Sequence, residues 1–208
     1  MPSRGASVCC FTFLDTVVCH LGSTSAIKDP LLATWPCCFV DSGSDRRSTY
    51  VAFVATSEAE GFRPQTAIDI GAFKGQWSRD MRQVFPDVNI LMVEPLPDMQ
   101  PCLELLAKQI GAETACQLLS EKAGEQVVFY VGSCGSSMHR PKRFSDSVTL
   151  TLATSCLDDL VAGSSFSTPD IVKLDVQGAE DCVMRGGERT LHGAEVLIIE
   201  LSLVIRAS

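Results

Sequence analysis

An acid followed by two closely spaced glycines marks the first segment with the residue types for binding chemistry. Residues 67–78 read AIDIGAFKGQWS, in which Asp69 lies in a short apolar run that leads to Gly71 and Gly75. A glycine after a buried strand lets the chain turn sharply and lets a ligand approach the backbone. The second glycine lets a helix begin close to the sheet, with free N–H groups at its N-terminus. This segment therefore predicts a ligand-binding turn.

A second acid, Glu94, ends the next apolar run, NILMVEP (89–95). In open parallel sheets, a carboxylate at the end of the second strand can accept two hydrogen bonds from a ribose diol. Turn and acid together predict a nucleoside site made by Asp69, Gly71, Ala72, Phe73, Gly75 and Glu94.

The spacing of the turn distinguishes between nucleoside ligands. The dinucleotide fingerprint GxGxxG places a pyrophosphate over the helix N-terminus, whereas this turn reads DxGxxxG, with Asp69 first. An acid at that position repels a pyrophosphate but suits a cationic or zwitterionic ligand, so we expect S-adenosylmethionine rather than a nicotinamide dinucleotide. A nicotinamide oxidoreductase and a plain strand–helix turn with a surface acid remain the alternatives.

Composition restricts the partners. The chain has 208 residues and a formal net charge of −8, which argues against nucleic-acid binding and favours a small molecule or a neutral glycan as partner. No apolar run reaches the about 18 residues of a membrane span. The N-terminal apolar run resembles a signal peptide, but Asp15 interrupts it.

Cysteine usage indicates a reducing compartment. The ten cysteines show no CxxC spacing and no paired His cluster, so we expect neither a disulfide framework nor a metal site. Four of them lie among apolar residues and are interpreted as small core residues: Cys102, Cys116, Cys156 and Cys182. We therefore expect a cytoplasmic protein.

The elements that must position these residues alternate between strand and helix from residue 62 onward. Strands are expected at 66–70, 89–95, 114–120, 169–176 and 194–205, and helices at 75–85, 98–110, 156–163 and 179–193. Asp98 is expected to cap the second helix, which Gly111 ends. A strand pair at 125–132 and 147–153 is expected to form a hairpin-like insertion. This alternation predicts an α/β fold, a doubly wound Rossmann-like parallel sheet.

Two domains are expected: an N-terminal extension of unknown role (1–60), which contains a polar linker at 41–49 and an apolar run at 50–56, and the α/β domain (61–208).

Five segments resemble the FkbM family of S-adenosylmethionine-dependent methyltransferases: AIDIGAFKGQWS, LMVEPLP, SCLDDLV, DIVKLDVQGAEDCVMRGGERTL and LIIELS. The resemblance runs from about residue 62 to 203, and KLDVQGAE (173–180) is its most specific part, with Gln177 in place of the usual Glu. It implies the class I methyltransferase fold and O-methylation of a hydroxyl on a sugar or another secondary metabolite. It also assigns the cofactor turn and the ribose acid to the residues named above.

The resemblance places Asp175 at the carboxyl end of the fourth core strand, where a residue faces methyl donor and acceptor. Asp175 is therefore the candidate catalytic residue, which orients the acceptor or removes its proton; the alternative is a capping acid that binds the N–H groups around 178–180. Glu180, in the first helical turn, is interpreted as a structural acid. Residues 135–137 are expected to border cofactor or acceptor, and His139 is a less favoured base.

The resemblance also implies an antiparallel hairpin after the fifth strand, which is absent from this order of elements. We expect a domain that lacks the last strands and leaves 194–205 as an exposed edge. Residues 1–60, a partner copy in a homo-oligomer, or an incomplete gene product are the three explanations. An inactive nucleoside-binding remnant is accordingly the alternative to a methyltransferase.

Overall fold

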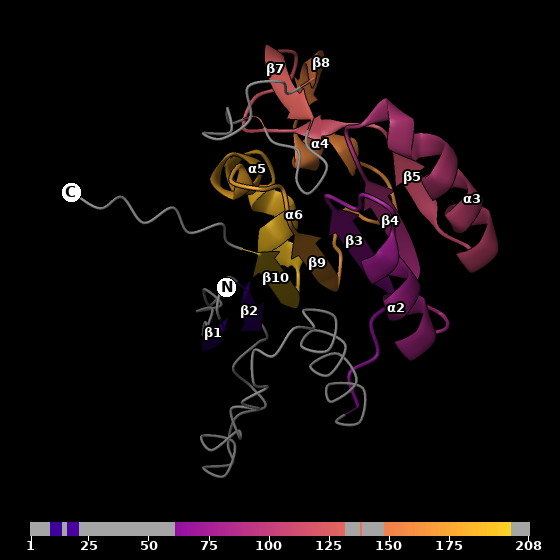
Figure 1. Ribbon diagram of the computed structural model, residues 1–208. Coiled ribbons are helices and arrows are strands. Elements are labelled where there is room, and N and C mark those ends of the chain that lie inside the picture. The colour runs from indigo at the N-terminus through magenta and orange to yellow at the C-terminus, as the bar shows by residue number, and fades with distance from the viewer. Residues whose placement is uncertain (1–8, 14–15, 21–60, 132–137, 139–147, 201–208) are drawn as a thin grey trace.

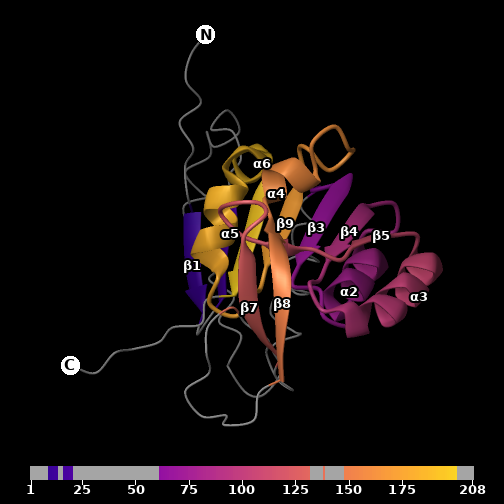
Figure 2. The same ribbon diagram turned by 90° about the horizontal axis from the view of Figure 1, so that it is seen from above.

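The computed structural model describes residues 9–13, 16–20, 61–131, 138 and 148–200. Within these ranges, a seven-stranded central sheet in the order β1-β2-β10-β9-β3-β4-β5 carries helices on both faces (Figures 1 and 2). Its strands are β1 (Cys9–Phe13), β2 (Thr16–His20), β3 (Thr66–Ile70), β4 (Asn89–Val93), β5 (Glu113–Ala115), β9 (Ile171–Leu174) and β10 (Val196–Glu200).

The five strands from β10 to β5 pair in parallel and form the doubly wound part of the sheet. From β5 to β10 across the sheet, they are the third, second, first, fourth and fifth of these strands in chain order, which is the order of a Rossmann sheet. The order reverses between β3 and β9, and ligands bind beyond the carboxyl ends of the strands at such a point. The predicted fold class is confirmed.

Among the helices in the described ranges, two cover one face of the sheet and three cover the other. On the first face lie α2 (Gln76–Val84) and α3 (Gln100–Ile110), the latter after a short 3-10 turn, η2 (Pro97–Met99). On the other lie α4 (Leu157–Leu160), α5 (Glu180–Gly186) and α6 (Glu188–Gly193). Alternate residues of each strand point to opposite faces, so β4 buries Ile90 and Met92 on the first face and Leu91 and Val93 on the second.

The N-terminal part of the chain closes the edge of the sheet at β10. Strand β2 pairs antiparallel with β10, with Val18 opposite Ile198, and β1 pairs antiparallel with β2 (Figure 1). The expectation of an exposed edge at β10 is therefore wrong, and cover by residues from the 1–60 segment is confirmed. The antiparallel hairpin next to the fifth parallel strand is present, but residues 9–20 supply it.

The predicted insertion forms a small second sheet above the carboxyl ends of the main strands. Strands β7 (Gln126–Val131) and β8 (Val148–Ser155) pair antiparallel, as predicted, and β6 (Leu118–Leu119) pairs in parallel with β8. The strand expected at 114–120 is therefore two strands in two sheets, because the chain leaves β4 after Ala115 and joins β8 at Leu118.

The helix expected at 179–193 is interrupted at Gly187, where α5 ends and α6 begins. The adjacent Gly186 lies close to the residue that follows β6, so that a Cβ atom on Gly186 would meet the Ser120 carbonyl oxygen at 2.0 Å. The two glycines thus permit close packing, as expected, but they also end a helix.

Two other local predictions differ from the structure. Asp98 lies within η2, and α3 begins without a side-chain cap, although Gly111 ends it in the left-handed conformation as predicted. Cys102 and Cys116 are exposed, and Cys156 and Cys182 are half-buried. The interpretation of these cysteines as core residues is therefore wrong.

Several predictions fall outside the described residues, namely those on 41–49, 50–56, 135–137, His139 and 201–205. None of the helices in the described ranges is both long and apolar enough to cross a membrane.

Candidate functional site

A cavity of about 240 Å³ lies at the carboxyl ends of β3, β4 and β9, beneath the small sheet. This is slightly below the roughly 300–1,000 Å³ typical of small-molecule sites. Its polar lining comes from Glu94, Gln117, Asp175 and Gln177, and apolar lining includes Leu96, Leu118, Phe129 and Met138. An apolar wall with a few convergent polar groups is typical of a site for a small organic ligand.

The glycine turn borders this cavity through Gly71. Gly71 has a φ of 77°, and the N–H groups of Gly71 and Ala72 both donate to the Val93 carbonyl, at 2.9 and 3.1 Å. A Cβ atom on Gly71 would lie 1.8 Å from the carbonyl oxygen of Asp175. Glycine is thus required both for the turn, as predicted, and for the close approach of the chain that leaves β9.

Gly75 sets the position of the helix that follows the turn. Its φ is 70°, and a Cβ atom there would lie 2.3 Å from Leu106 on α3 and 3.1 Å from the Met92 sulfur on β4. The expectation that this glycine lets the helix begin close to the sheet is confirmed. Neither Gly75 nor Ala72 lines the cavity, so their direct contact with a cofactor remains a prediction.

Phe73 lies at the cavity with its backbone in the left-handed region, at a φ of 50°. This conformation is unfavourable for a bulky residue. Its N–H donates to Glu94 Oε2 at 2.8 Å, and its ring, 44% exposed, lies 5.2 Å from the Lys74 ammonium. The contact with Glu94 stabilises the strained turn.

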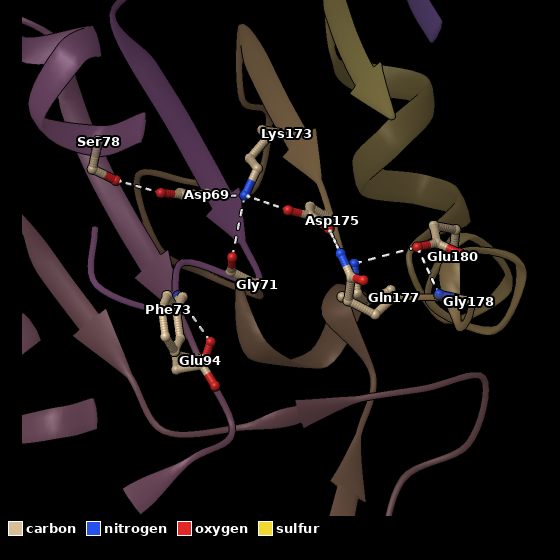
Figure 3. Close-up of polar contacts among 11 residues, drawn as sticks. Asp69, Gly71, Phe73, Ser78, Glu94, Lys173, Asp175, Gln177, Gly178 and Glu180 are labelled. Carbon is tan, nitrogen blue, oxygen red and sulfur yellow. Dashed lines mark hydrogen bonds and ion pairs between the residues drawn. The ribbon is translucent and has the colours of Figure 1, made fainter. Parts of the chain in front are cut away.

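Glu94 connects the turn to the end of β4. Its Oε2 accepts from the Phe73 N–H (Figure 3). Its Oε1 accepts from the Leu96 N–H at 3.1 Å, so two backbone donors fix the carboxylate. Burial raises the pKa of Glu94; these two hydrogen bonds oppose the rise, and the nearby Asp69 adds to it. A carboxylate has about four acceptor positions, so roughly two remain for a ligand in the cavity.

Asp69 is completely buried and does not line the cavity. Its Oδ2 accepts from the Ser78 hydroxyl at 2.7 Å, and its Oδ1 lies 3.1 Å from Lys173 Nζ (Figure 3). The ion pair of Asp69 with Lys173 was not predicted from the sequence. The available signal was a single lysine inside the apolar strand IVKL, because a buried lysine requires a carboxylate partner. A direct role of Asp69 toward a cofactor remains a prediction.

Asp175 lies at the cavity, as predicted for a residue at the end of the fourth parallel strand. Its Oδ1 accepts from Gln177 Nε2 at 2.6 Å, and its Oδ2 lies 3.6 Å from Lys173 Nζ. The N–H groups of Gly178 and Val176 donate instead to Glu180 Oε1, at 3.0 and 3.3 Å. These contacts support the structural role expected for Glu180, whereas the capping alternative for Asp175 stays a prediction.

Of the predicted site residues, the structure brings Gly71, Phe73, Glu94 and Asp175 together around one cavity. Within the described part of the chain, no three His, Cys, Asp or Glu side chains gather so that they could hold a metal ion.

Comparison with solved structures gives matches to methyltransferases at low identity. One is the plantazolicin methyltransferase BamL, solved in complex with a triazolic desmethylPZN analog and SAH, with a TM-score of 0.41, 11% identity, and coverage of 71% of this chain and 40% of that one. Another is precorrin-6y C5,15-methyltransferase from Geobacter metallireducens GS-15, with a TM-score of 0.40, 11% identity, and coverage of 72% and 60%. This chain spans 40 to 60% of the length of these two proteins.

Comparison with curated proteins gives no match. Comparison with protein families gives the methyltransferase FkbM domain over residues 69–206. This range contains the glycine turn, Glu94 and the segment KLDVQGAE. The match covers more than half of the 208 residues, so the chain belongs to the FkbM methyltransferase family.

Proposed function

We propose that this protein is an S-adenosylmethionine-dependent methyltransferase that methylates a hydroxyl group of a small molecule or glycan. The observation that carries the proposal is the Glu94 carboxylate, which two backbone N–H groups hold at the end of the second parallel strand. It lines a cavity at the switch point of the sheet and keeps acceptor positions for a ribose diol.

The residues around the cavity fit this cofactor in charge as well as in shape. Three carboxylates, Asp69, Glu94 and Asp175, lie in or directly under the site, against one ammonium, Lys173. Such a surplus of acids suits a ligand with a positive centre and no phosphate. Leu96, Leu118 and Phe129 supply apolar surface for a purine ring. When bound, S-adenosylmethionine supplies a methyl group on a positively charged sulfur, which departs as a neutral thioether.

Asp175 is the residue that we assign to the acceptor. It lines the cavity and carries the donors Gln177 and Lys173 on its two oxygens, so it can accept a hydrogen bond from an acceptor hydroxyl and then its proton. The remaining contribution of the protein is orientation, which lowers a barrier by fixing the reacting groups in line.

A calorimetric titration tests the proposal. We expect the purified protein to bind S-adenosylmethionine and S-adenosylhomocysteine with a stoichiometry of about one, and NADH much more weakly, because a pyrophosphate would face the surplus of acids. Transfer of a labelled methyl group to members of a panel of hydroxylated acceptors then tests catalysis. Absence of binding to both adenosyl compounds would contradict the proposal, and binding without transfer to any acceptor would favour a non-catalytic nucleoside-binding protein.

A cytoplasmic location belongs to the same proposal. Cys102, Cys116, Cys156 and Cys182 are free thiols, and the first two of them are exposed. Exposed free thiols are compatible with a reducing compartment.

A further inference from the structure

A line of polar contacts runs under the cavity from Ser78 on α2 to the end of β9 (Figure 3). Lys173 Nζ lies at its centre, 3.1 Å from Asp69 Oδ1, 3.1 Å from the Gly71 carbonyl oxygen and 3.6 Å from Asp175 Oδ2. One ammonium thus connects the cofactor turn to the carboxylate that we assign to the acceptor. A displacement of either would change the position of the other.

Gln177 provides the second donor to Asp175, from the opposite side. Its Nε2 donates to Asp175 Oδ1 at 2.6 Å, and both residues line the cavity. An amide N–H can only donate, and an ammonium can only donate. Gln177 and Lys173 therefore each present a donor to a different oxygen of Asp175, and the two contacts together fix the orientation of the carboxylate.

The backbone of Gln177 is held in a conformation that few side chains adopt. Its φ is 55°, in the left-handed region that glycine, asparagine and aspartate occupy most readily. The N–H groups on both sides of it, those of Val176 and Gly178, bind the buried Glu180 carboxylate. Such strain persists only where the surroundings fix it, and it is frequent at functional sites.

We propose that Gln177 is a positioning residue which, together with Lys173, fixes the orientation of the Asp175 carboxylate, so that its remaining acceptor positions face the bound methyl group and the acceptor. The proposal rests on the proposed function. Two of the roughly four acceptor positions of Asp175 are used by Gln177 and Lys173, and the others remain for the acceptor hydroxyl. With the cofactor bound, Asp175 would take the hydroxyl proton while the hydroxyl oxygen gains the methyl group, and the sulfur–methyl bond would break to leave a neutral thioether.

Sinefungin and S-adenosylhomocysteine test this geometry without a known acceptor. In sinefungin, a carbon with a protonated primary amine replaces the sulfur and its methyl group, so a positive N–H donor lies where the methyl group would lie. A correctly oriented Asp175 carboxylate accepts a charge-assisted hydrogen bond from that amine, whereas S-adenosylhomocysteine has no such donor. Calorimetry with both ligands therefore gives an affinity ratio that reports on Asp175 alone.

We expect the parent protein to bind sinefungin about tenfold or more tightly than S-adenosylhomocysteine. Asp175→Asn should bring the ratio close to one. Gln177→Met, which keeps the size of the side chain and removes the donor, should lower the ratio about threefold to tenfold and change the affinity for S-adenosylhomocysteine by less than about twofold. The matched control is Gln76→Met, since Gln76 donates to Asp80 on α2 and not to the site; it should change neither affinity.

Three results would overturn the inference. These are an equal affinity of the parent for the two ligands, an unchanged ratio in Gln177→Met, or a parallel loss of both affinities in that variant, which would indicate a merely structural role. Failure of the proposed function has a different signature, because the parent would then bind neither ligand.

Discussion

Replacement of Glu94 by glutamine is the sharpest perturbation of the proposed cofactor site. Each oxygen of Glu94 already accepts one backbone N–H, from Phe73 and from Leu96. Glutamine has one oxygen and one NH₂ group, so it loses the negative charge and one set of acceptor positions. A hydrogen bond to a charged group contributes about 1.5–3 kcal/mol, and the loss of one ribose contact should therefore raise the Kd for S-adenosylhomocysteine about 10- to 150-fold.

The pKa of Glu94 adds a second signature to this prediction. Burial raises that pKa, so the parent gains a proton at a higher pH than an exposed glutamate would. Protonation removes an acceptor from the ribose site, and the affinity of the parent should fall as the pH is lowered through the raised pKa. The same shift makes ionisation oppose folding, so the contribution of Glu94 to stability is largest below its ordinary pKa and is lost as the pH rises through the folded value.

Calorimetric titration with S-adenosylhomocysteine between mildly acidic and neutral pH measures the Kd of the parent and of Glu94→Gln and the dependence of each Kd on pH. Glu94→Gln should bind weakly and show a flatter pH profile than the parent. Glu104→Gln, an exposed residue of α3, is the matched control and should behave as the parent does. A Kd for Glu94→Gln within about twofold of the parent value would refute the assignment, because a lost charged contact costs more than that.

Three further substitutions test the fold around the site by urea denaturation. Lys173→Met should lower the free energy of unfolding by about 3–5 kcal/mol, because it leaves the buried Asp69 without its cation. The double variant Lys173→Met/Asp69→Asn should recover part of this loss. A loss below about 1 kcal/mol in Lys173→Met would contradict a buried ion pair. Gly71→Ala should lower the free energy of unfolding more than Gly124→Ala. Both glycines have a positive φ, but of the two only Gly71 has a backbone carbonyl, that of Asp175, at 1.8 Å from the added Cβ. Equal losses of stability would contradict the close approach of Gly71 to Asp175. Val18→Pro should cost about 3 kcal/mol, since β2 pairs on both sides, whereas Val18→Thr should cost much less; a neutral proline would contradict the pairing with β10.

The local pattern of the sequence predicts most of the parallel sheet. Alternation of short apolar runs with helical periodicity determines which segments form β3, β4, β9 and β10, and the glycines after β3 mark the turn beside the cavity. These features are predictable because each depends on residues close together in the chain. The position of Glu94 follows from the end of its own strand.

Features that depend on distant residues were either not predicted or, like the cover of β10 by residues from the 1–60 segment, predicted only as one of three explanations. Lys173 pairs with Asp69 across a separation of 104 positions. The residue spacing around Lys173 or around Asp69 does not indicate that the two side chains meet. The β1–β2 hairpin joins β10 across most of the chain, and its five-residue strands are too short for a clear period. The contact of Gln177 with Asp175 depends on a positive φ, which a residue other than glycine does not reveal in the sequence.

A crystal structure of the protein with S-adenosylhomocysteine tests the central claim most directly. The account predicts the ligand in the cavity at the ends of β3, β4 and β9, with both ribose hydroxyls within hydrogen-bond distance of the Glu94 carboxylate and the thioether sulfur on the side of Asp175. A ligand bound elsewhere on the chain, or a ribose that makes no contact with Glu94, would contradict it.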